Sequence, residues 1–253
     1  SISIPHALAG LVTVTILFTY FHLYSYPVGG GGLYLKMAEQ IKANYYLLPT
    51  KINQYSASGY PFAYPPFMLY ILAILRDIGL SRLTLVRFLP VLFVLGYIYF
   101  THRLVGEYTG SSLAANLAVI LAATNPVVYA LHLRGGGIVR AAAMLFTVAG
   151  LYTGVKLFRS HDRRWLTASI GLFAITILTH PIYPIFYGCG YIALWLSEDR
   201  SIGGLRQGIV VAAGGLLVTS PWWGLMIVRY GVNIFLIASQ THGGLDRQPM
   251  LLY

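Results

Sequence analysis

The segment PPFMLYILAILRD (Pro65–Asp77) is too short to cross a membrane, and the topology of the whole chain depends on that fact. Its apolar part runs for only about ten residues before Arg76 and Asp77, whereas a membrane-spanning helix needs about 20 apolar residues. The segment is therefore predicted to be an amphipathic helix lying along the membrane interface. If it crossed the bilayer instead, every later loop would change sides.

The composition of the chain indicates an integral membrane protein. Of its 253 residues, 57% are hydrophobic and 9% are charged, whereas soluble domains carry about 25% charged residues. So few charges cannot cover a water-facing surface, and no soluble basic domain is left to bind nucleic acid. The net charge of +10 reflects few acids, and it suits anionic lipid headgroups or a phosphate-bearing substrate. The expected fold class is an all-α polytopic membrane protein.

The other apolar runs predict about seven transmembrane helices. With a cytoplasmic N-terminus, most bases in short loops fall inside, as the positive-inside rule requires. The protein is thus expected to be a multi-pass protein of the plasma membrane whose first loop is extracytoplasmic. The inside bases are Arg103, Arg200, Arg206 and a cluster within residues 156–164. The predicted spans cover residues 6–26, 83–101, 111–131, 138–157, 165–179, 181–196 and 207–228.

One membrane domain is expected over residues 1–253. A large first external loop covers residues 27–82 and is expected to carry surface-lying amphipathic helices. A second external loop covers residues 132–139, and residues 229–253 begin a further external segment.

The segment GLYLKMAEQIKANYY (Gly32–Tyr46) predicts a helix that rests on the membrane surface. Apolar side chains at every fourth residue would form one face of this helix. Its charged residues fit a plain structural helix as well as they fit a catalytic role. The expected apolar face consists of Leu33, Met37, Ile41 and Tyr45.

Further along the same loop, three prolines in GYPFAYPPF (Gly59–Phe67) exclude regular helix. Tyr60 and Tyr64 lie at this break. Two interpretations stay open for each tyrosine: anchoring at the membrane interface, or stacking on a sugar ring.

Many basic residues fall on the predicted external side, which usually carries few. They either reach toward lipid phosphates or line a pocket that holds a phosphate or pyrophosphate. Four candidates for such a pocket lie near loops with glycine or proline: Arg134, Arg140, His180 and Arg229.

The sequence lacks the common signatures of other chemistry. The single cysteine, Cys189, excludes an internal disulfide. There is no Walker-type phosphate loop, no zinc-ligand spacing and no nucleophile elbow. No metal site is predicted, and no pair of matching halves indicates a transporter.

The order of several segments resembles a known superfamily. A span is followed by GGGGLYLKMAEQI, then by YPP at the start of an amphipathic run, and then by LVRFLPVL at the start of a span. This order is similar to the N-terminal part of the GT-C superfamily of polyprenyl-phosphate-sugar-dependent glycosyltransferases, which includes the protein O-mannosyltransferases and the aminoarabinose transferases of lipid A. The later THP and SPWW…RYG segments look like an archaeal or bacterial branch.

The resemblance implies a specific activity. A sugar would pass from a dolichyl- or undecaprenyl-type phosphate to a glycan, lipid or protein acceptor on the extracytoplasmic face, with inversion. The resemblance also implies a seven-span core and a chain that continues past Tyr253. No cofactor is certain, and a divalent metal stays open.

The same resemblance raises a question about the catalytic acid. The family commonly has an aspartate four residues before a tyrosine of the first loop; with Tyr34 as that tyrosine, the matching position is Gly30. Glycine cannot accept a proton. A second family acid falls at Gly135–Gly137, where no acid is present. Glu39 and Asp246 are the substitute candidates.

Two functional hypotheses follow, and a transporter is a weaker third. The chain is either a glycosyltransferase with a displaced base, or a non-catalytic relative that binds a lipid carrier or serves as a scaffold subunit. In the enzyme, the four basic candidates would neutralise the donor phosphate, since arginine binds phosphate oxygens in pairs. The residues expected to contact substrate are Tyr60, Tyr64, Lys51 and His242.

Overall fold

The computed structural model describes residues 4–24, 31–53, 59–134 and 137–241, and these residues are almost entirely helical. This confirms the all-α class. In chain order the elements are α1 (Ile4–Leu23), α2 (Gly31–Ala43), β1 (Lys51–Ile52), β2 (Tyr60–Pro61), α3 (Phe67–Asp77), α4 (Arg82–Thr109), α5 (Ser112–Thr124), α6 (Pro126–Tyr129), the π-helical turn η1 (Ala130–Arg134), α7 (Gly137–Ser160), α8 (Arg163–Ile177), α9 (Tyr183–Glu198), α10 (Ile202–Tyr230) and α11 (Asn233–Thr241).

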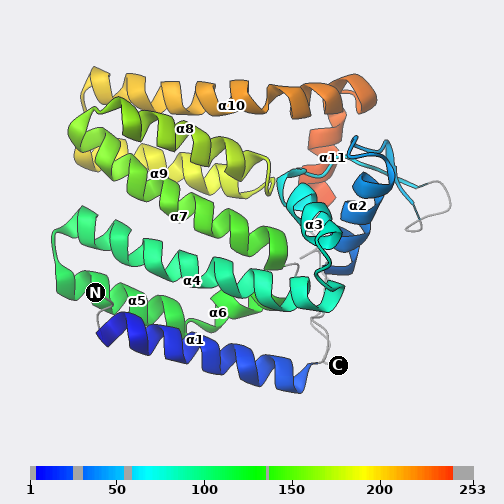
Figure 1. Ribbon diagram of the computed structural model, residues 1–253. Coiled ribbons are helices and arrows are strands. Elements are labelled where there is room, and N and C mark those ends of the chain that lie inside the picture. Colours follow the sequence, from blue (N-terminus) through cyan, green and yellow to red (C-terminus); the bar gives the residue numbers. More distant parts are fainter. Residues whose placement is uncertain (1–3, 25–30, 54–58, 135–136, 242–253) are drawn as a thin grey trace.

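The long helices lie side by side, and the first loop gathers at one end of them (Figure 1). This end carries α2, α3, α11 and the antiparallel pair β1–β2, and we call it the loop end. α3 has 11 residues, which confirms that the Pro65–Asp77 segment is a helix too short to span a bilayer.

Within the described residues, three helices are long and apolar enough to cross a membrane: α4, α7 and α10. α5 and the following segment to His132 form a fourth candidate, bent by 53°. Seven spans are therefore not supported. α8 and α9 have 15 and 16 residues, and at about 1.5 Å per residue they fall short of a hydrocarbon core of about 30 Å. The turn at Leu178–Ile182 separates α8 from α9, at the break that the sequence predicted between residues 179 and 181.

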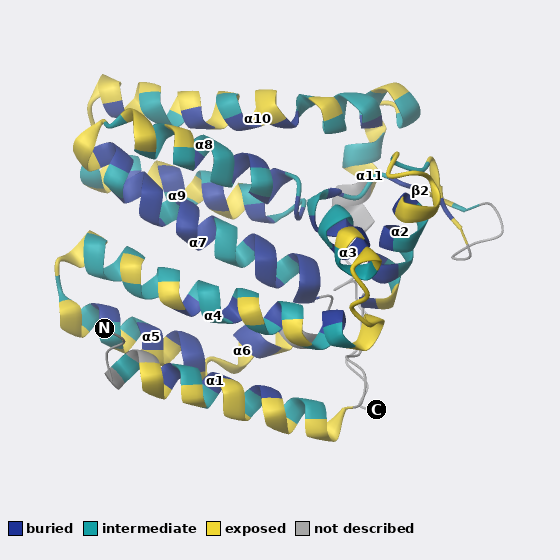
Figure 2. Cartoon of the chain, in the orientation of Figure 1, coloured by how far each residue is buried: buried dark blue, intermediate teal, exposed yellow. Residues whose placement is uncertain are grey.

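Large apolar side chains cover the outer faces of the bundle. Phe18 on α1 is 74% exposed and Leu217 on α10 is 73% exposed. Figure 2 shows exposed residues along the outward faces of α1, α5 and α10. Soluble monomers rarely expose apolar surface on this scale. The long apolar helices and their exposed faces are compatible with the expected membrane protein.

α7 is the central helix of the bundle. Of its most apolar stretch, 72% is buried, compared with 28% for α4 and 22% for α10. Two glycines four residues apart let α9 approach it closely. A Cβ atom at Gly150 would lie 2.1 Å from Cε2 of Tyr187, and one at Gly154 would lie 2.9 Å from Cζ of Tyr191. Small residues commonly form such helix contacts in membranes.

Hydrogen bonds join α7, α8 and α9 at the same contact. The Tyr187 hydroxyl donates to the Ser169 carbonyl at 2.9 Å, and the Tyr191 hydroxyl donates to the Gly150 carbonyl at 3.2 Å. The hydroxyls of Thr153 and Ser169 lie 3.0 Å apart. Buried polar groups away from water need such partners, so this network and the glycine contact specify one packing of the three helices.

Ion pairs hold the opposite end of the bundle. Arg159 on α7 contacts Glu198 on α9 at 2.5 Å, and it donates to the Glu107 and Tyr108 carbonyls at the end of α4. Lys156 pairs with Glu107 at 2.6 Å. The basic cluster at 156–164 thus lies at the end of the bundle opposite the loop end. The sequence likewise predicts that these bases and the first loop lie on opposite sides of the membrane.

The first-loop helix differs from its prediction in two respects. Its apolar face is buried against protein, because Met37 and Ile41 are 1% and 0% exposed and pack in a core with residues of α3 such as Leu69. The helix also ends at Ala43, so Tyr45 is 90% exposed instead of lying on that face. A core beneath the loop replaces the membrane surface as its support.

Gly150→Ala is expected to destabilise the protein by about 1–3 kcal/mol, because the new methyl group overlaps the Tyr187 ring in a filled core. Thermal unfolding in detergent measures the change. The control is Gly188→Ala on α9, where a Cβ atom meets nothing within 4 Å. The control should gain up to about 1 kcal/mol, since alanine favours helix over glycine. Equal melting temperatures for the two variants would contradict this packing.

Cysteines placed at Lys51 and Val232 are expected to react with a membrane-impermeant maleimide from the same side. The reason is that the Tyr230 hydroxyl donates to the Thr50 carbonyl at 2.5 Å, which joins the two segments at the loop end. A cysteine at Arg163 should react from the other side. The measurements use a Cys189→Ser background, since Cys189 is exposed. Labelling of the first two positions from opposite sides would overturn the arrangement.

Candidate functional site

A group of buried polar residues lies at the loop end, where the first loop meets the helix bundle. We call it the tyrosine–histidine cluster. Its members come from α2, the β2–α3 loop, η1, α7, the turn between α8 and α9, and the start of α9, so the fold brings together residues far apart in the sequence. The cluster consists of Tyr34, Tyr64, His132, Arg140, His180 and Tyr183.

A backbone hydrogen bond fixes the first loop on the bundle. The Phe67 amide donates to the Leu178 carbonyl at 2.8 Å, which joins the start of α3 to the end of α8. Prolines on both sides of this junction prevent the helices from continuing. Tyr64 and His180 lie at the two breaks in the helical backbone, and the junction places them next to each other.

Ring contacts and hydrogen bonds link the cluster in a row. The hydroxyls of Tyr34 and Tyr64 lie 3.3 Å apart. The Tyr64 ring meets His180 edge to face at 6.3 Å between centroids, and His180 meets Tyr183 in the same way at 5.1 Å. His132 Nε2 lies 3.1 Å from the Tyr183 hydroxyl. Both histidines are almost fully buried, at 3% and 2% exposed.

A glycine positions His132. A Cβ atom at Gly137 would lie 1.5 Å from the His132 carbonyl oxygen, so only glycine permits the turn η1 to fold back onto the start of α7. Gly137 thus lies directly against the backbone of His132, whose side chain contacts Tyr183.

Arg140 supplies the positive charge of the cluster. It lies in the first turn of α7, and its charge acts on Tyr34, Tyr64, His132 and Tyr183. No carboxylate among the described residues forms a salt bridge with it. A cation that lies among neutral phenols and imidazoles is suited to an anionic ligand.

The two phenols from the first loop stay neutral. Burial raises the pKa of Tyr34, and it raises the pKa of Tyr64 well above the ordinary value of 10.0; the Arg140 charge opposes both increases. Both residues therefore keep their hydroxyl protons at neutral pH and can donate hydrogen bonds.

The Ile182 amide donates to His180 Nδ1 at 3.3 Å, so neutral His180 carries its proton on Nε2.

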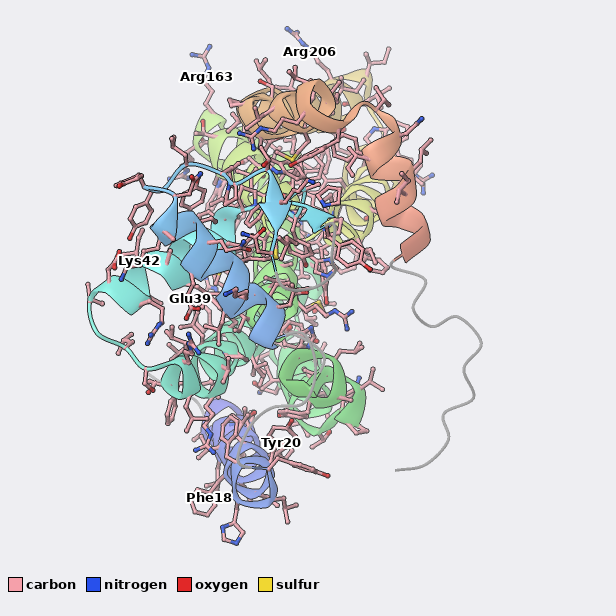
Figure 3. All side chains as sticks on the ribbon, turned by 90° about the vertical axis from the view of Figure 1, so that its right-hand side faces the viewer. Phe18, Tyr20, Glu39, Lys42, Arg163 and Arg206 are labelled. Carbon is pink, nitrogen blue, oxygen red and sulfur yellow. The ribbon has the colours of Figure 1, made fainter. Side chains whose placement is uncertain are left out.

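The carboxylates of the described chain are occupied elsewhere. Each has a basic side chain within 4.0 Å. Glu39, one substitute for the catalytic acid, binds Arg82 at 2.7 Å. Asp77 binds Lys42 and Tyr46, which lower its pKa. The pairs are Glu39–Arg82, Asp77–Lys42, Glu107–Lys156, Asp162–Arg164, Glu198–Arg159 and Asp199–His161. Figure 3 labels Glu39 and Lys42 on α2.

Three of the expected site residues meet in the cluster: Arg140, His180 and Tyr64. Arg229 does not join them. Its guanidinium donates to the Leu48 and Pro49 carbonyls at 3.0 and 3.1 Å, so it anchors the first loop to α10.

The other expected residues have different positions. Lys51 and Tyr60 lie on the β1–β2 pair and are exposed, Tyr60 by 56%. Arg134 ends η1, and its side chain lies outside the described part of the structure. Gly30, His242 and Asp246 lie outside the described residues.

Three members of the cluster were not predicted to be site residues: Tyr34, which served only to locate the family acid position at Gly30, His132 and Tyr183. His132 carried a usable signal, since a histidine at the end of an apolar run is a functional candidate. Tyr183 carried the same signal as Tyr64, because it also lies beside prolines, Pro181 and Pro184. Among the described residues, no group of three His, Cys, Asp or Glu side chains has the arrangement of a metal site.

Comparison with known proteins finds no matching family model, no matching curated protein and no matching solved structure. The superfamily resemblance therefore rests on the sequence segments quoted above.

Proposed function

We propose that the tyrosine–histidine cluster binds the phosphate of a polyprenyl-phosphate-linked sugar, and that the protein transfers this sugar to an acceptor on the extracytoplasmic face. The observation that supports this most is Arg140. Its guanidinium forms no salt bridge with a described carboxylate, and its charge acts on the phenols of Tyr34, Tyr64 and Tyr183.

The chemistry of sugar transfer from a phosphate carrier suits this arrangement. The acceptor oxygen forms a bond to the anomeric carbon of the sugar while the bond from that carbon to the phosphate oxygen breaks. The acceptor hydroxyl gives its proton to a base, and the polyprenyl phosphate leaves with the bonding electrons as added negative charge. An arginine fork can contact two phosphate oxygens. The Tyr34 and Tyr64 hydroxyls can donate to the remaining oxygens. Stabilising the leaving charge with groups already in place is a large part of catalysis in such sites.

The distribution of charge supports an extracytoplasmic position for the loop end. The basic cluster of residues 156–164 lies opposite the loop end, so a cytoplasmic position for that cluster puts the loop end outside. We propose that α1, α8, α9 and the bent segment from α5 to His132 cross the bilayer together with α4, α7 and α10, as a seven-span bundle in the plasma membrane. Their alignment with α4, α7 and α10 supports this (Figure 1). Because α8 and α9 are shorter than the usual hydrocarbon core, the bilayer would be thinner around them.

A second function is favoured by one specific observation. Every described carboxylate is paired with a base, and none lies in the cluster. A general base for the acceptor hydroxyl is thus not evident in this part of the chain. The alternative is a non-catalytic relative that binds the lipid carrier in a membrane complex. A transporter has no comparable support.

Arg140→Gln is expected to weaken binding of undecaprenyl phosphate and dolichyl phosphate about ten- to hundredfold, since a hydrogen bond to a charged group contributes about 1.5–3 kcal/mol. Arg140→Lys should lose less affinity, because lysine keeps the positive charge but lacks the planar guanidinium that can contact two phosphate oxygens. Equilibrium binding to purified protein measures both. Arg163→Gln, at the opposite end, is the control and should bind as the native protein does. Unchanged affinity in Arg140→Gln would refute the phosphate site.

Transfer of labelled sugar from polyprenyl-phosphate donors in membranes separates the two functions. The native protein and Gly30→Asp are compared. If the protein is an enzyme, the native protein and Gly30→Asp should both be active, because the catalytic base is a residue other than the one at position 30. Activity in Gly30→Asp alone would support the non-catalytic alternative, because the aspartate would have restored a missing base.

A further inference from the structure

A groove on the lipid-facing side of the bundle lies between α1 and α4, on different helices from the tyrosine–histidine cluster. Its volume is about 490 Å³, within the usual range of about 300–1,000 Å³ for small-molecule sites. Apolar side chains line most of it, among them Val14, Leu17 and Val91. Phe18, another lining residue, is 74% exposed and lies on the outer side of α1 (Figure 3).

The two polar residues of the groove lie together at one end. α1 runs toward the loop end and α4 runs away from it (Figure 1). His22, next to the last residue of α1, therefore lies at the same end as Arg87, in the second turn of α4. Val14 and Leu17 lie one to two turns deeper on α1. The groove thus has a cationic end near the helix termini and an apolar part toward the middle of the bundle.

An aromatic contact holds the cation at the end of the groove. The Arg87 guanidinium lies over the Phe21 ring at 5.6 Å, and Phe21 contacts Phe88 at 6.4 Å. No aspartate or glutamate is among the described residues that line the groove. An arginine held in this way can contact phosphate oxygens in pairs.

We propose that this groove binds an anionic phospholipid of the bilayer, with its phosphate at Arg87 and His22 and one acyl chain along Val14, Leu17 and Val91. The order of charge and apolar surface matches that of a phospholipid at a membrane interface. The surrounding surface is exposed and apolar, as contact with lipid requires, since Phe88 and Leu92 are 58% and 64% exposed. The site is independent of the proposed glycosyl transfer and uses none of its residues.

The test uses the full chain in detergent with added dioleoylphosphatidylglycerol, and native mass spectrometry counts the bound lipid. Dioleoylglycerol has the same chains without phosphate, and inorganic phosphate lacks the chains. The native protein should retain phosphatidylglycerol and neither of the other two. Arg87→Gln should reduce the bound fraction at least fivefold. Arg206→Gln, a control on α10 at the opposite end, should not.

A second variant separates loss of the site from loss of the fold. Val14 is 53% exposed to the lipid side, so Val14→Trp should fill the groove without disturbing the core. It should lose phosphatidylglycerol and keep the native melting temperature. Retention of the lipid by Val14→Trp or by Arg87→Gln would overturn the proposal. The proposal would also be overturned if the native protein bound undecaprenyl phosphate in preference to phosphatidylglycerol and both variants lost that binding. The groove would then hold the lipid carrier. Arg140→Gln should bind phosphatidylglycerol normally.

Discussion

The close approach of α9 to α7 at Gly150 is the constraint on which the rest of the structure depends. Any side chain larger than hydrogen at this position would overlap the Tyr187 ring, which is 1% exposed. In a bilayer the hydrophobic effect does not drive helices together, so contact packing and hydrogen bonds must do so. The Tyr187 and Tyr191 hydroxyls supply those bonds to α8 and α7. Once these three helices are joined, the turn before α9 has a defined place at the loop end.

The turn before α9 then positions the first loop. The Phe67 amide reaches the Leu178 carbonyl, and a core of α2 and α3 residues packs beneath the loop. Tyr34 and Tyr64 are thereby brought to His180. The loop is thus a packed extension of the bundle, held also by the Arg229 contacts to the Leu48 and Pro49 carbonyls. Arg229, a residue expected to bind ligand, thus contributes to holding the loop through one nitrogen of its guanidinium.

Part of the candidate site could be inferred from the sequence. Arg140 and His180 stand out there because basic residues beside apolar spans are functional candidates. Tyr64 stands out because it lies at a break formed by three prolines. His132 and Tyr183 could not be grouped with them, since their proximity depends on the fold of η1 against Gly137. The pairing of Glu39 with Arg82 could not be predicted from the sequence either. Forty-three positions separate these residues, and no local pattern relates them.

The sequence by itself determined the all-helical class of this protein and the shortness of the Pro65–Asp77 helix. These follow from composition and from the length of apolar runs, which are local properties of a chain and its solvent. Only the tertiary structure decided where the helices end, which bases are already paired, and that Arg140 lies among uncharged partners. Those features depend on contacts between distant segments, whose energies are settled by packing and by the need to satisfy each buried polar group.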